Sequence, residues 1–148
     1  MVLEFGLRFL AFGMLGLLIE NIFTGIRSLL VKNWFGTCTT YLWMLPVYGI
    51  AGLALDGVHS LLQFHWLLMA PIYVAIIYGT EFTSAWILKK LIGAVPWDYG
   101  LSKWTPFGFV NFTYPYALSW FALACAFNPI SLAMSHALNG LLTLLSSV

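Results

Sequence analysis

The stretch WLLMAPIYVAIIYGTEFTSAWIL, residues 66–88, decides the fold of this chain. Its one charged side chain is Glu81, in a run that is otherwise apolar or neutral. A helix needs about 20 mostly apolar residues to cross about 30 Å of hydrocarbon. Residues 66–88 therefore predict a membrane-spanning helix that carries a carboxyl group inside the bilayer.

The composition of the whole chain is typical of a membrane protein. Of its 148 residues, 61% are hydrophobic and only 7% are charged, whereas an average soluble domain has roughly 25% charged residues. The net charge of +1 argues against nucleic acid as a partner. Cys38 and Cys125 show no CxxC spacing, so we interpret both as free thiols and expect neither a metal site nor a cofactor.

Four apolar runs predict an all-α fold, a four-helix transmembrane bundle in a single domain of residues 1–148. The predicted spans cover about residues 3–26, 40–62, 66–88 and 111–127. Asn128-Pro129 predicts a break after the fourth span, because proline removes a helical hydrogen bond. The apolar segment 130–148 could be a fifth span, but we favour a kinked extension of the fourth span or a helix that lies at the membrane interface.

The basic residues predict how the spans are oriented. The connections after the first and third spans carry Arg27, Lys32, Lys89, Lys90 and Lys103. The connection between the second and third spans has no lysine or arginine. By the positive-inside rule the two basic loops are cytoplasmic, which places the N-terminus on the other side of the membrane.

A weak internal repeat predicts how the spans are related. Glu20 and Glu81 each open a similar passage: a basic residue, a loop with a tryptophan (Trp34 or Trp97), and then an aromatic span that contains proline. Such a repeat predicts two helical hairpins in parallel orientation, related by an axis along the membrane normal. Shared constraints at the membrane interface would produce a similar pattern.

Two carboxyl groups are expected at membrane depth, Glu20 in the first span and Glu81 in the third. An ionised carboxylate there costs on the order of 3 kcal/mol unless it is paired, hydrated or protonated. The functional interpretation is an intramembrane polar pocket between the two spans, formed by Glu20, Thr24, Tyr78, Glu81 and Ser84. The structural interpretation is a packing seam in which hydrogen bonds hold the carboxyl groups neutral.

Small residues accompany this polar set on the first span. Gly13, Gly16, Glu20 and Thr24 follow a spacing of three and four residues, so they form one stripe on a helix. Small residues let helix backbones approach closely in a membrane. The stripe is therefore expected to face protein rather than lipid.

Other polar residues are expected near the membrane surfaces. Trp97, Asp98 and Tyr99 in the third loop predict an interfacial anchor in which Asp98 caps a turn or pairs with a lysine; the alternative is that Asp98 folds back over the pocket. Asp56 and His59 are three residues apart near an outer helix end, which is more typical of a surface pair than of a metal site.

Several of these segments together resemble a known family. They are Leu17 to Thr24, Gly36 to Gly49, Glu81 to Lys89, Pro96 to Tyr99 and Tyr116 to Phe121, in that order. They resemble the four-helix membrane proteins named transmembrane protein 229 and the bacterial relatives labelled "putative ABC-transporter type IV". The resemblance covers the chain up to about Phe127 and implies four spans, but it implies no particular activity. Gly100 departs from the family pattern, since many relatives have serine there.

Three functional hypotheses follow. The first is a non-catalytic accessory or scaffold subunit of a larger membrane complex, with membrane lipids and other membrane subunits as partners. The second is a small carrier or channel, proton-linked through Glu20 and Glu81. The third is a lipid-modifying enzyme with Glu81 or Asp98 as general base, which lacks support because no nucleophile or metal cluster accompanies the acids.

Overall fold

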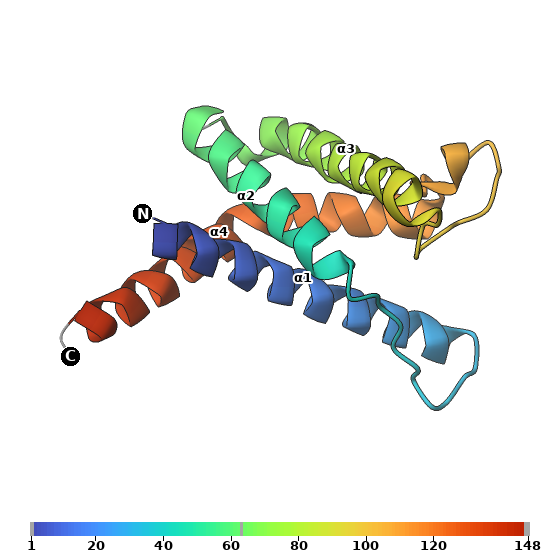
Figure 1. Ribbon diagram of the computed structural model, residues 1–148, viewed down its shortest axis with the longest axis horizontal. Helices are drawn as coiled ribbons and strands as arrows, with labels where there is room; N and C mark the ends of the chain where they lie inside the picture. Colours follow the sequence, from blue (N-terminus) through green and yellow to red (C-terminus); the bar gives the residue numbers. More distant parts are fainter. Residues whose placement is uncertain (1, 63, 147–148) are drawn as a thin grey trace. The chain divides into compact units, whose positions relative to one another are not determined.

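The computed structural model describes residues 2–62 and 64–146, and over these residues the chain is helical (Figure 1). The long helices are α1 (Val2–Leu30), α2 (Met44–Leu62), α3 (Trp66–Ile92) and α4 (Tyr114–Ser146), and a short 3₁₀ turn, η1 (Pro106–Gly108), precedes α4. Within the described ranges there is no strand, only an isolated bridge between Ser102 and Thr105. Each of the four long helices is long and apolar enough to cross a membrane, which confirms the predicted all-α, four-span fold.

The described chain divides into two compact units, residues 1–53 and 54–148, with the boundary inside α2. Each unit is described below by itself. That all 148 residues form a single transmembrane domain, with two hairpins in parallel orientation, stays a prediction.

The first unit contains α1, a folded-back connection and the start of α2. The connection turns sharply where Lys32 and Gly36 adopt positive φ angles of 64° and 60°. The Asn33 side chain holds this turn by donating to the Thr37 hydroxyl and accepting from the Phe35 amide. The chain then runs back along the second half of α1 before α2 begins at Met44 (Figure 1). The second helix thus starts four residues later than predicted, because residues 40–43 belong to this connection.

Glycines of α1 let α2 approach closely within this unit. A Cβ atom on Gly13 would lie 2.7 Å from the Leu45 carbonyl oxygen, and one on Gly16 would collide with the Tyr48 ring. The same holds in the other direction, since a Cβ atom on Gly49 would lie 2.6 Å from the Phe9 ring. The expectation that the glycines of the α1 stripe face protein therefore agrees with the contacts of Gly13 and Gly16.

The second unit is built on α3 packed against α4 (Figure 1). The buried face of α3 repeats every three or four residues, which is the spacing of one helix face, and comprises Met69, Ala70, Tyr73, Ile77, Glu81, Ala85 and Leu88. Phe127 of α4 packs edge-on against Tyr73, with ring centroids 5.1 Å apart. Among the described residues, Glu81 is the one charged residue on this buried face of α3.

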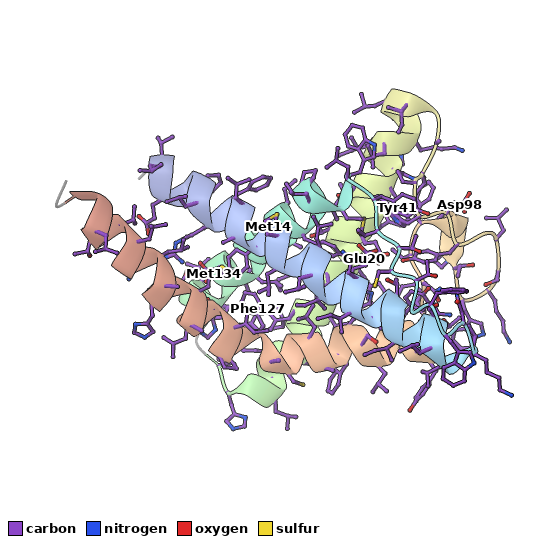
Figure 2. All side chains as sticks on the ribbon, turned by 90° about the horizontal axis from the view of Figure 1, so that it is seen from below. Met14, Glu20, Tyr41, Asp98, Phe127 and Met134 are labelled. Carbon is purple, nitrogen blue, oxygen red and sulfur yellow. The ribbon has the colours of Figure 1, made fainter. Side chains whose placement is uncertain are left out.

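The fourth helix does not end at Phe127. It continues through Pro129 to Ser146 and bends close to Phe127 (Figure 2), as expected where proline interrupts the helical hydrogen bonds. The helix is therefore longer than the predicted fourth span, and the segment after Asn128-Pro129 continues it beyond the bend. Which part of α4 crosses the membrane stays a prediction. Residues 147 and 148 lie outside the described residues, and a position of the extension at the interface stays a prediction.

Candidate functional site

Glu20 lies in the second half of α1 (Figure 2). It is bonded to the connection that folds back along this helix. The Thr40 hydroxyl donates a hydrogen bond to its carboxylate, and the Tyr48 side chain is a second hydrogen-bond partner. Both partners lie in the first unit. The carboxyl group thus fastens the connection and the first turns of α2 to α1.

Thr24, one turn further along α1, extends this attachment. Its hydroxyl donates to the Glu20 carbonyl oxygen at 2.9 Å and accepts from the Thr39 amide at 3.0 Å. The Thr39 amide, which belongs to an extended segment with no strand beside it, is thereby hydrogen-bonded to a side chain. Glu20 and Thr24, which the sequence placed in one set, do lie together, and they bind consecutive residues of the same connection.

Glu81 lies in the second unit and is almost completely buried, with 4% of its surface exposed. The Tyr99 hydroxyl donates to Glu81 Oε1 at 2.9 Å. Tyr99 reaches the carboxyl group from the loop between α3 and α4, eighteen residues further along the chain. Glu81 therefore fixes this loop over the buried face of α3.

The loop is ordered by its own hydrogen bonds. Asp98 Oδ1 accepts from the Gly100 amide at 2.8 Å, and the Tyr99 amide donates to the Gly108 carbonyl oxygen at 3.0 Å. Gly108 has a φ of 73°, and a Cβ atom there would collide with the Asp98 carboxylate. The turn-capping role expected of Asp98 is thus observed, and it is Tyr99 that contacts the carboxyl group of Glu81.

Trp97 bonds within the loop between α3 and α4, and Tyr78 attaches this loop to α3. The Trp97 ring is 5% exposed, and its indole N–H donates to the Phe109 carbonyl oxygen at 3.2 Å. The Tyr78 hydroxyl donates to the Asn111 carbonyl oxygen at 3.1 Å. Trp97 is therefore packed into the protein. Whether the loop lies at the membrane interface stays a prediction.

Ser84 lies on α3, and Asn111 lies in the connection before α4. Ser84 is half-buried on α3, one turn after Glu81. Asn111 opens a glycosylation sequon, but it is buried, and its side-chain oxygen accepts from the Thr113 amide and hydroxyl. Sequence reasoning missed Thr40 and Tyr48 as partners of Glu20, because nothing in the spacing shows where a connection folds back.

A second polar cluster was also missed. Asp56 and His59 were expected to form a surface pair, but their partners come from other helices. The Ser131 hydroxyl of α4 donates to Asp56 Oδ1, and His59 Nδ1 lies 2.8 Å from the Tyr73 hydroxyl of α3. The Tyr73 hydroxyl also donates to Asn128 Oδ1 of α4 at 3.0 Å. The correct signal was the matching i,i+3 spacing of Asn128 and Ser131, which puts two polar groups on one face of α4.

Among the described residues no group of three or more histidine, cysteine, aspartate and glutamate side chains could hold a metal ion. Cys38 and Cys125 are free thiols, as expected. Glu20 and Glu81 each have hydroxyl partners in their own unit, which is a donor set for holding a carboxyl group rather than for binding a cation.

Four helices, each long and apolar enough to cross a membrane, define a polytopic integral membrane protein. The chain belongs to the family described as "Putative ABC-transporter type IV", which matches residues 7–146. This confirms the resemblance and extends it past Phe127 through the bent part of α4. No curated protein and no solved structure matches the chain.

Proposed function

We propose that the protein is a non-catalytic accessory or scaffold subunit of a larger membrane complex. The observation that carries this proposal is the bonding of Glu81, which is 4% exposed and accepts a hydrogen bond from the chain's own Tyr99. A carboxyl group bonded in this way holds a loop in place. Glu20 does the same for the first connection through Thr40.

The outer surfaces of the helices support a role in assembly. Ala75, Gly79 and Thr83 are exposed and spaced by four residues, so they form a row of small side chains on α3. A Cβ atom on Gly79 would meet no atom within 4 Å. Such a row allows close approach by another membrane helix, which is how helices associate where no hydrophobic driving force exists.

The family description names a class of transporter. The chain itself has no Walker loop, so a role in nucleotide-driven transport would require a partner that supplies the nucleotide-binding domain. We further propose that the last turn of α1, with Arg27, and the connections that contain Lys32 and Lys103 face the cytoplasm, and that the N-terminus lies on the opposite side.

Native extraction of the tagged full chain in a mild detergent, followed by mass spectrometry of intact particles, tests this proposal. We expect a second polypeptide in fixed ratio to this chain. Gly79→Leu should reduce that ratio at least tenfold, because a branched side chain prevents close helix approach. Gly140→Leu is the matched control, since Gly140 is also an exposed helical glycine without atoms within 4 Å of its Cβ position.

A proton-linked carrier is the second candidate, favoured by one observation. Glu81 and Tyr99 place a carboxyl group and a hydroxyl in contact inside the second unit, which is a pair that can hold and release a proton. This candidate predicts pH-dependent flux in proteoliposomes that Glu81→Gln abolishes. Flux that Glu81→Gln leaves unchanged would exclude this role for Glu81.

A further inference from the structure

The cluster of Asp56, His59, Tyr73, Asn128 and Ser131 lies entirely in the second unit and joins α2, α3 and α4. Tyr73 is 1% exposed, and Ser131 is also buried. His59 is three residues before the end of α2, so the cluster begins within one turn of the α2–α3 connection. The proposed accessory role does not explain why Asp56, His59 and Tyr73 are all hydrogen-bonded near the end of α2, and Glu81 is not part of this cluster.

The hydrogen bonds fix where the protons are. Asn128 Oδ1 can only accept, so the single hydroxyl proton of Tyr73 points to Asn128. The contact of 2.8 Å between Tyr73 and His59 Nδ1 must then be an N–H donated by the imidazole. His59 is therefore held with its proton on Nδ1, and Nε2 takes no part in these bonds.

The polar groups around His59 come from every helix of the cluster, and the charged one among them is Asp56. On its own helix, Asp56 lies one turn earlier, close enough for an i,i+3 interaction. From α3 it faces the Tyr73 phenol, and α4 contributes the neutral Asn128 and Ser131. The other histidines lie elsewhere: His65 accepts from the Leu67 amide at the start of α3, and His136 is exposed on α4.

We propose that this cluster is a proton-binding site next to the α2–α3 connection. The lone pair of His59 Nε2 forms a bond to one proton from a hydronium ion, which is left as water, and Nδ1–H keeps its bond to Tyr73. The Asp56 carboxylate balances the added charge. Histidine is the side chain that ordinarily changes charge near neutral pH, and a charged donor strengthens the bond to Tyr73. Acidity on this side of the membrane thereby tightens the hold of α3 on the end of α2. The inference is independent of the accessory role.

Nitrogen NMR of ¹⁵N-histidine-labelled full chain in lipid nanodiscs tests the site, because the two imidazole tautomers and the charged ring have different ¹⁵N shifts. His65→Gln and His136→Gln leave His59 as the one labelled ring. At pH 8 we expect the Nδ1–H tautomer in the majority, and at pH 5 the doubly protonated ring. An Nε2–H majority at pH 8, or a ring that stays neutral at pH 5, overturns the proposal.

Variants of the cluster show whether its hydrogen bonds determine the tautomer of His59. Tyr73→Phe should return His59 to the Nε2–H tautomer, and Tyr78→Phe, which removes a hydroxyl from the same helix outside the cluster, should leave it unchanged. If Tyr73→Phe does not fold, Asn128→Ala serves the same purpose, since it frees the Tyr73 proton to bond to Nδ1 and so favours Nε2–H. A tautomer that neither cluster variant changes contradicts the proposal.

Discussion

At the scale of single residues, the carboxyl groups of Glu20 and Glu81 are each matched by a hydroxyl of the same unit. Glu81 has Tyr99 at 2.9 Å, and Glu20 has Thr40. Hydrogen bonds to charged groups contribute about 1.5–3 kcal/mol, and a buried partner left without its bond costs a similar amount. These bonds therefore lower the cost of placing carboxyl groups inside membrane helices and tie two connections to their helices.

Tyr99→Phe removes one hydroxyl and leaves the ring in place. We expect the free energy of unfolding to fall by about 1–3 kcal/mol, because buried Glu81 loses its donor. Steric trapping or reversible unfolding in mixed micelles measures this. Tyr114→Phe is the control, since Tyr114 is 77% exposed, and an equal loss in both variants would contradict the role of Tyr99.

At the scale of elements, hydropathy predicted the helices but not the conformation of the connections between them. The buried spacing of α3 and the proline in α4 were readable from the sequence, because both are local properties. The contacts of Thr40 with Glu20 and of Tyr99 with Glu81 were not, because they join residues twenty and eighteen positions apart through turns without a sequence period. The burial of Trp97 was not readable from the sequence for the same reason, and its expected role as an interfacial anchor stays a prediction.

Close packing of α1 on α2 gives a prediction at this scale. Gly16→Leu should destabilise the packing of α1 on α2 by about 1–3 kcal/mol, because any side chain there collides with the Tyr48 ring. The Tyr48 side chain is also a hydrogen-bond partner of Glu20. Gly6→Leu should be close to neutral, since a Cβ atom on Gly6 meets nothing within 4 Å. Unfolding midpoints of the two purified variants in the same detergent distinguish them. Equal midpoints would show that the α1 glycines are not needed for packing.

At the scale of the whole molecule, the two basic connections predict the orientation in the membrane. Cys38 lies in the first of them and is exposed, whereas Cys125 is half-buried in α4. In a Cys125→Ser background, a membrane-impermeant maleimide should label Cys38 in inverted vesicles and not in intact cells. Labelling in intact cells would contradict the predicted orientation.

The most direct test of the accessory role is the composition of the natively extracted particle. The account predicts that mass spectrometry finds this chain with a second membrane polypeptide in a fixed ratio, and that Gly79→Leu removes the second polypeptide whereas Gly140→Leu retains it. A homogeneous particle that contains only this chain, in both variants and in the unaltered protein, would contradict the account and direct attention to transport through Glu81.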